Sequence, residues 1–385
     1  MKAKLGFLWK YVILKKTDIL KMALMYEGLE SFGCKKGIVG LLISVISINC
    51  FLATAQQSPR TYTVLKANEL LKIDGRALEA SWKDAGWSED FIDIEGVKTP
   101  LYRTRMKMLW NEDYLYFFAK IEEPHVWGTL KQRDTVIFYN NDFEIFIDPD
   151  GDTHDYMEFE MNVLNTIWDL WLTKPYRNGA KVIDGWDIHG LKTAVHIDGT
   201  LNDPNDKDAG WSVEIAMPWK AILEAAKDNR IPVNEFWRLN FSRVNWEYEL
   251  ENGRYSRKKD ESGKYLPEYN WVWSPQGVIN MHEPEHWGYV YFSNESATHV
   301  NFTISSDEKI KWHLYTLAHR LWSAEKNRST KPKKADLQKS FNISDIEVFP
   351  LFEEHTTGWN LSVMSPFSNK RLTVREDGKF ISYDE

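Results

Sequence analysis

Cysteine is nearly absent, with 2 among 385 residues, Cys34 and Cys50. Both precede Ala55, in a segment whose pattern predicts its removal, so we expect no disulfides in the folded protein. An excess of basic charge is also lacking, because 48 Lys and Arg residues stand against 56 Asp and Glu residues, for a formal net charge of -8. Nucleic acid is therefore excluded as an expected partner, since its phosphates require a basic protein face.

Long apolar runs are scarce as well, and the run over residues 37–52 is short for a membrane span, which needs about 20 residues. A lysine-rich opening precedes it, and Ala53, Thr54 and Ala55 follow it. This layout predicts a signal peptide over residues 1–55 that is cleaved after Ala55. We therefore expect export to the periplasm, cell surface or extracellular space, with no membrane span in the mature chain.

Two alternatives stay open at this end of the chain. The charged leader is long, so translation could begin at an internal methionine such as Met22 or Met25. Cys50 could instead be the acylated residue of a lipoprotein, although Asn49 fits poorly because small residues are expected there. The class of signal peptidase is therefore left undecided.

Tryptophan is abundant, with 18 residues of which only Trp9 precedes Ala55. A globular core rarely needs so many. Surplus indole suits a sugar-binding surface, because the apolar C–H face of a pyranose stacks on flat rings while its hydroxyls need polar partners.

Alternating apolar and polar residues predict a mainly β fold. The hairpin over residues 104–110 and 114–121 shows the period of two that is typical of strands. Further strands are predicted at residues 143–148, 156–163, 167–172, 191–197, 211–217, 236–245 and 287–292. Many short strands joined by polar turns indicate an antiparallel β-sandwich, jelly-roll-like in character.

Two helices interrupt this pattern. A short one after Pro218 is expected to cap one end of the sandwich, and an amphipathic one is predicted over residues 307–326. A basic linker and weak strand signals at residues 346–352 and 359–364 follow. The predicted organisation is a signal peptide (1–55), a sandwich (56–298) and a C-terminal extension of unknown role (299–385).

Several separated motifs resemble those of the family 9 carbohydrate-binding modules. In chain order they are IDG at 73–75 with ASW at 80–82, LWN at 109–111 with LY at 115–116, NDFEIFIDP at 141–149, GWSVEIAMPW at 210–219 and NFSR at 240–243. The resemblance spans about residues 71–292. It implies a β-sandwich that binds sugars between tryptophans, commonly with structural calcium. Insertions around residues 129–140 and 252–270 depart from the family pattern, so the identity of the sugar does not carry over.

Candidate sugar-binding residues are aromatic and polar side chains in or beside expected loops. Trp127 and Arg133 would combine a stacking ring with a hydrogen-bond donor, and Trp271 and Trp273 would form a platform on one face of a loop-like stretch. Trp168 and Trp171 face opposite sides of one strand, and we assign Trp171 to the site. The remaining candidates are Arg243, Asn245 and Trp246.

For each of these residues a purely structural role was the alternative. Trp127 could fold back onto the sheet edge, and Arg243 could pair with a carboxylate of a neighbouring strand. Six other tryptophans sit beside regular elements and are assigned to the core: Trp82, Trp87, Trp110, Trp211, Trp219 and Trp237.

Closely spaced aspartates suggest a calcium site, because calcium prefers hard oxygen ligands. The candidate ligands are Asp148, Asp150, Asp152 and Asp155, and a solvated acidic turn is the alternative. The segment His282 to His286 matches the two histidines and one glutamate of zinc proteases. We reject that activity because Pro284 would break the helix that it requires.

The sequence thus favours a non-catalytic carbohydrate-binding protein that serves the capture or catabolism of polysaccharides. Its expected partners are an oligo- or polysaccharide and glycoside hydrolases. One alternative is a glycoside hydrolase, although no pair of carboxylates stands out. Another is a structural or partner-binding sandwich whose surplus aromatic residues form an interface.

Overall fold

The fold is that of a computed structural model, which describes residues 58–294 and 302–384. The predicted signal peptide lies outside these residues, as does the predicted boundary between 298 and 299, so both stay predictions. Within the described ranges, no helix has both the length and the apolar character needed to cross a membrane.

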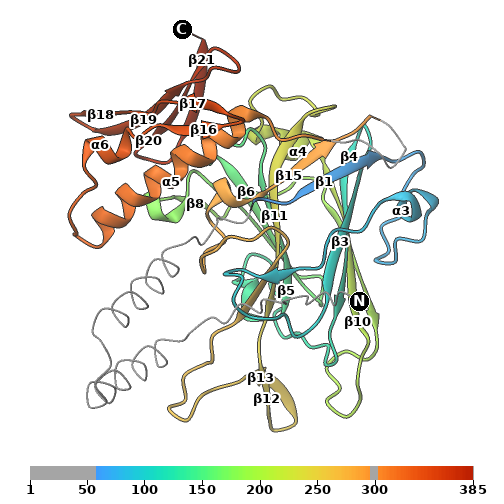
Figure 1. The fold of residues 1–385 in the computed structure, drawn as a ribbon. Coiled ribbons are helices and arrows are strands. Elements are labelled where there is room, and N and C mark those ends of the chain that lie inside the picture. The colour runs from blue at the N-terminus through green and yellow to red at the C-terminus, as the bar shows by residue number, and fades with distance from the viewer. Residues whose placement is uncertain (1–57, 295–301, 385) are drawn as a thin grey trace, which may run out of the picture. The chain divides into compact units, whose positions relative to one another are not determined.

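A large curled sheet dominates the molecule (Figure 1). β14 (Tyr269–Val272) pairs with β11 off the main path of this sheet, and β2 (Ile92–Asp93) pairs with β14. The main path, in spatial order, runs through β8 (Val182–Ile183), β7 (Ile167–Leu172), β6 (Tyr156–Asn162), β5 (Asp142–Asp148), β11 (Phe236–Asn245), β15 (Gly288–Phe292), β1 (Thr61–Lys66), β3 (Thr104–Trp110), β4 (Tyr114–Glu122), β10 (Gly210–Pro218) and β9 (Lys192–Asp198).

β1 joins the two halves of this sheet into a sandwich. Its first four residues pair with β15, and its last two pair with β3. Inward-facing residues of both halves then meet in one core, where the rings of Phe117 in β4 and Phe241 in β11 lie 5.9 Å apart. Because side chains alternate along a strand, the opposite faces of the same strands remain available for other roles.

The predicted mainly β class and the sandwich are confirmed, and its strand pairs are antiparallel except for those of β1, which runs parallel to β15 and β3. Strands β3, β7 and β11 have the predicted bounds. The predicted cap is a short helix, α4 (Trp219–Ile222), continued by the 3-10 turn η4 (Leu223–Ala225). Its Trp219 ring packs 5.6 Å from Trp237, so the cap is part of the core.

Short elements decorate the sandwich. A helix, α3 (Ala80–Asp84), covers one face of it, and a separate hairpin overlaps the start of the predicted insertion at residues 252–270. The hairpin consists of β12 (Tyr248–Glu251) and β13 (Arg254–Arg257), and the 3-10 turns are η2 (Ile137–Tyr139), η3 (Tyr176–Asn178) and η5 (Pro284–His286).

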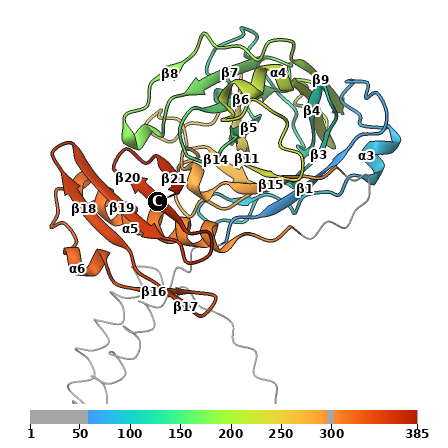
Figure 2. The same cartoon turned by 90° about the horizontal axis from the view of Figure 1, so that it is seen from above.

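The C-terminal extension has its own hydrophobic core between a helix and a small sheet. The helix α5 (Ser306–Lys326) packs against β19 and β20, as Figure 2 shows from above. Ser305 caps it by accepting a hydrogen bond from the Glu308 amide. The other elements are α6 (Lys334–Leu337), β16 (Phe341–Ile343), β17 (Ile346–Val348), β18 (Leu351–His355), β19 (Gly358–Met364), β20 (Lys370–Arg375) and β21 (Phe380–Asp384).

The extension contacts the sandwich through polar groups. Thr153 donates its hydroxyl to the Gly378 carbonyl at 2.8 Å, and Tyr289 donates to Glu308 in α5 at 2.6 Å. The Arg177 guanidinium lies 4.7 Å from the centre of the Trp322 ring. These contacts fix where α5 meets the end of the large sheet.

Candidate functional site

A groove lies on the outer face of the large sheet, over β5, β6, β7, β11 and β14. Its cavity volume is about 360 Å³. The polar and aromatic residues of its lining are Phe138, Glu144, Phe146, Glu158, Glu160, Trp168, Tyr176, Glu268, Asn270, Asn280 and His282. The groove therefore combines flat rings with hydrogen-bonding groups on one face.

Strand register explains why these side chains meet. Glu144 of β5 lies opposite Ser242 of β11 and opposite Glu160 of β6. Glu160 in turn lies opposite Trp168 of β7. Since side chains of paired residues point to the same face, one row across the sheet presents two carboxylates and an indole.

Burial makes the carboxylates of the groove unusual. It raises the pKa of Glu144 to about 7. Burial, followed by the charges of neighbouring carboxylates, raises the pKa of Glu158 and Glu160 well above the usual range. Such groups can donate as well as accept hydrogen bonds near neutral pH.

Buried atoms of this face that lack a hydrogen-bond partner among the described residues include Nε1 of Trp168 and Oδ2 of Asp142. Buried polar atoms are normally paired, so these two are available for a ligand. Trp168 is half-buried, which leaves part of its ring exposed for stacking.

Loop residues form the rim of the groove. Tyr176 of η3 is 48% exposed, and its ring lies 4.4 Å from that of His282. His282 Nδ1 is 3.0 Å from the Tyr156 hydroxyl. Burial lowers the pKa of His282 to about 3, so this ring is neutral at physiological pH. The rim thus adds aromatic surface without adding charge.

The acidic turn after β5 meets lysines of the extension. Both carboxylate oxygens of Asp148 accept backbone N–H groups, from Gly151 and Thr153, at 2.9 Å. Lys311 donates to the Gly151 carbonyl, and Lys379 Nζ lies 3.0 Å from Asp152 Oδ2. Asp148, Asp150 and Asp152 still cluster. Because two ammonium groups already lie beside the three carboxylates and offset part of their charge, the turn is a weaker candidate for calcium. Calcium at this turn stays a prediction.

Asp155 was a predicted fourth ligand, and it does not join that cluster in the part of the chain described. Its Oδ1 instead accepts a hydrogen bond from the Trp171 indole at 3.3 Å. A better fit to calcium is the buried all-oxygen set of Asp142, Glu144 and Glu160, whose oxygens lie within 4.8 Å of one another. Calcium held there would neutralise the charge of the groove.

The predicted platform of Trp271 and Trp273 is wrong. The two side chains are 1% and 0% exposed and belong to the core between the sheet halves. Trp271 lies in β14, and the Cα of Gly288 faces the Trp273 ring so closely that a Cβ there would clash. A stacking surface must expose a ring face, which neither residue does.

Trp127 and Trp246 are also buried, which corrects their assignment as stacking residues. Trp127 packs against the ring of Tyr255, a residue of the inserted hairpin, at 6.1 Å. Trp246 donates its Nε1–H to the Phe138 carbonyl at 2.7 Å. Residues distant in sequence thus cover both rings. The residues next to Trp127 and Trp246 in the sequence therefore do not predict that these side chains are buried.

Arg243 pairs with a buried carboxylate, which is the structural alternative to sugar binding. It is fully buried, and its Nη2 lies 3.0 Å from Glu123 Oε2. Asn245 is 3% exposed and, with Trp246, lines a smaller cavity of about 170 Å³. Neither Arg243 nor Asn245 lines the outer-face groove.

The prediction that Trp168 and Trp171 face opposite sides is confirmed, but the assignment to the site is wrong. Trp171 packs toward the core, and Trp168 lines the groove. Arg133 forms ion pairs with Asp169 and Asp187 and lines a separate cavity. Glu144, Glu158 and Glu160 are not among the residues predicted for the site, although pairing of the predicted strands places them on the same face as Trp168.

Comparison with known proteins adds the family. Residues 73–234 match the family described as carbohydrate family 9 binding domain-like. None of the curated proteins matches the chain.

Solved structures are similar in part. A family 9 carbohydrate-binding module from Caldicellulosiruptor kristjanssonii in complex with cellotriose has 16% identity and a TM-score of 0.40, over 64% of this chain and 100% of that one. Its glucose complex gives 14% identity and a TM-score of 0.41, over 63% and 100%. A Bacteroides uniformis protein proposed to bind carbohydrate has 15% identity and a TM-score of 0.45, over 61% of this chain and 100% of that one. Residues 73–234 of the chain are thus similar to the carbohydrate family 9 binding domain-like family.

Proposed function

We propose that this chain binds an oligo- or polysaccharide in the outer-face groove, with a sugar ring stacked on Trp168. The family of residues 73–234 supports carbohydrate binding. The observation that carries the location is the row in which Trp168 lies beside Glu160 and Glu144. A partly exposed indole next to hydrogen-bonding carboxylates suits a pyranose, which is apolar on its face and polar at its edge.

Export fits this function. The N-terminal pattern predicts delivery outside the cytoplasm, where polysaccharides and glycoside hydrolases occur together. In that setting the protein would retain sugar chains for capture or breakdown by partner enzymes.

The test is a titration of the protein with plant and host oligosaccharides, followed by tryptophan fluorescence and calorimetry. We expect Trp168→Ala to weaken binding about tenfold or more, because it removes the stacking surface. Trp171→Ala is the matched control, since that ring lies on the opposite side of the same strand. Equal affinities of the two variants would exclude the groove as the site.

Glycoside hydrolysis is a second candidate, and one observation favours it. Oxygens of Glu144 and Glu160 lie within 4.8 Å, and the pKa values of both groups are raised by burial. Retaining glycosidases place two carboxyl groups about 5 Å apart, one of them protonated. Release of reducing sugar by the wild type that is lost in Glu160→Gln would establish this activity in place of simple binding.

A further inference from the structure

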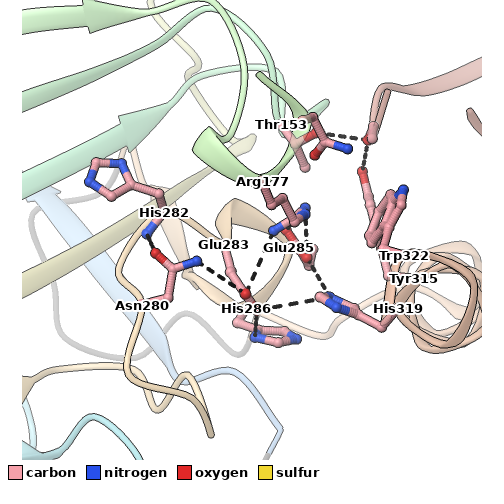
Figure 3. Close-up of polar contacts among 12 residues, drawn as sticks. Thr153, Arg177, Asn280, His282, Glu283, Glu285, His286, Tyr315, His319 and Trp322 are labelled. Carbon is pink, nitrogen blue, oxygen red and sulfur yellow. Dashed lines mark hydrogen bonds and ion pairs between the residues drawn. The ribbon is translucent and has the colours of Figure 1, made fainter. Parts of the chain in front are cut away.

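Two glutamates and two histidines meet where the extension contacts the sandwich (Figure 3). Glu283, Glu285 and His286 come from the η5 turn and the residue before it, and His319 comes from α5. One donor atom from each of the four lies within 4.8 Å of the others. The chain thus brings a mixed nitrogen and oxygen donor set together across about 35 residues of sequence, a separation that only tertiary packing can close.

The distances between these atoms are those of a coordination sphere. His319 Nε2 is 2.7 Å from Glu285 Oε1 and 3.9 Å from Glu283 Oε2, and His286 Nδ1 is 3.5 Å from that same Glu283 oxygen. Ligands about 2.0–2.1 Å from a tetrahedral zinc ion lie about 3.3 Å from one another. The separations of 3.5 and 3.9 Å lie just above that value, and the 2.7 Å contact is a direct hydrogen bond between His319 and Glu285 that a bound metal would replace.

Two of the four donor atoms have no hydrogen-bond partner among the described residues. Glu283 is 8% exposed and its Oε2 is unpaired, as is His286 Nδ1, although the two atoms face each other. Leaving a buried carboxylate oxygen unpaired costs free energy. A bound cation would satisfy both atoms at once.

Neighbouring polar side chains contact the two carboxylates of the cluster. Asn280 donates to Glu283 Oε1 at 3.2 Å, and Arg177 Nη2 lies 2.9 Å from both carboxylate oxygens of Glu285, the ligand oxygen Oε1 included. In metal sites, hydrogen bonds from neighbouring side chains orient the residues that bind the metal. Arg177 also balances one of the two carboxylate charges, so the cluster keeps a net negative charge for a divalent cation.

His282, the first histidine of the protease-like motif, is not in this cluster, because its Nδ1 lies beside the Tyr156 hydroxyl. The rejection of the protease pattern therefore stands, and His319 supplies the second imidazole from a different element.

We propose that Glu283, Glu285, His286 and His319 bind one divalent transition-metal ion of the zinc type, which fastens the C-terminal extension to the sandwich. This site is separate from the sugar proposal, since none of the four residues lines the groove. Imidazole and carboxylate ligands suit zinc and its neighbours, and four protein ligands are typical of a structural site.

The test uses the full chain, stripped with EDTA and titrated with ZnCl₂ by calorimetry. We expect one zinc ion per chain, and binding that is weakened by roughly 100-fold or more in His319→Ala and in Glu283→Gln, because each removes one ligand. His355→Ala is the control, as it removes an exposed histidine of the same extension and leaves the cluster intact. Unchanged zinc affinity in the two ligand variants would overturn the proposal.

A second measurement covers variants that fail to fold. CoCl₂ added to the stripped wild type should give the visible absorption bands of tetrahedral cobalt, and zinc should abolish them. Zinc should also raise the midpoint of thermal unfolding of the wild type, because it binds only the folded state. Absence of the cobalt bands, with no zinc-dependent stabilisation, would instead show that these four residues form only metal-free ion pairs.

Discussion

Replacing Glu144 by glutamine tests whether a buried, ionised carboxylate in the groove lowers the free energy of unfolding. Glu144 is 5% exposed, and burial raises its pKa from 4.5 to about 7. In the unfolded chain the same group titrates near 4.5. Between these two values the folded state binds more protons than the unfolded state, so wild-type stability falls as the pH rises through this interval.

The size of the effect follows from the two pKa values. Each pKa unit corresponds to about 1.4 kcal/mol, and most of the interval lies between pH 5 and pH 8. We therefore expect ionisation of Glu144 to remove about 2 to 3 kcal/mol from wild-type stability over that range. Glutamine cannot ionise. The advantage of Glu144→Gln over the wild type should grow by this amount from pH 5 to pH 8.

Urea unfolding at both pH values measures the effect, with EDTA present so that no divalent cation neutralises the groove. Glu353→Gln is the control, because that glutamate is exposed on β18 and should behave alike at both pH values. If the difference between Glu144→Gln and the wild type is the same at pH 5 and pH 8, the argument from burial is refuted.

Three further substitutions test the assignments within the fold by urea unfolding at pH 7. Arg243→Ala should cost about 3–5 kcal/mol, because it leaves Glu123 buried and unpaired, and a loss below 1 kcal/mol would contradict this pairing. Trp273→Ala should cost about 3–5 kcal/mol by opening a core cavity, whereas lost sugar affinity with unchanged stability would restore the platform hypothesis. Lys311→Met should cost about 1–3 kcal/mol, because it strips the Gly151 carbonyl of its buried donor, and a neutral effect would show that this lysine does not hold the acidic turn.

Strand positions could be predicted from the sequence because alternation is a local signal. The bounds of β3 and β7 came directly from it, and α5 came from helical spacing. The exposure of individual tryptophans could not be predicted in the same way. Trp127 is covered by Tyr255, a residue about 130 positions later. The local sequence around either residue does not predict that contact.

The two proposed sites differ in how much of each could be predicted from the sequence. β5, β6 and β7 are consecutive and antiparallel, and the short turns between them fix the register, so Glu144, Glu160 and Trp168 meet through local pairing alone. That row follows from the predicted strands once they are paired. His319 is different, because its approach to Glu285 depends on how α5 docks against the end of the sandwich. A donor set completed by docking becomes visible only in three dimensions, and this explains why a motif that fails as a helical zinc pattern can still belong to a metal site.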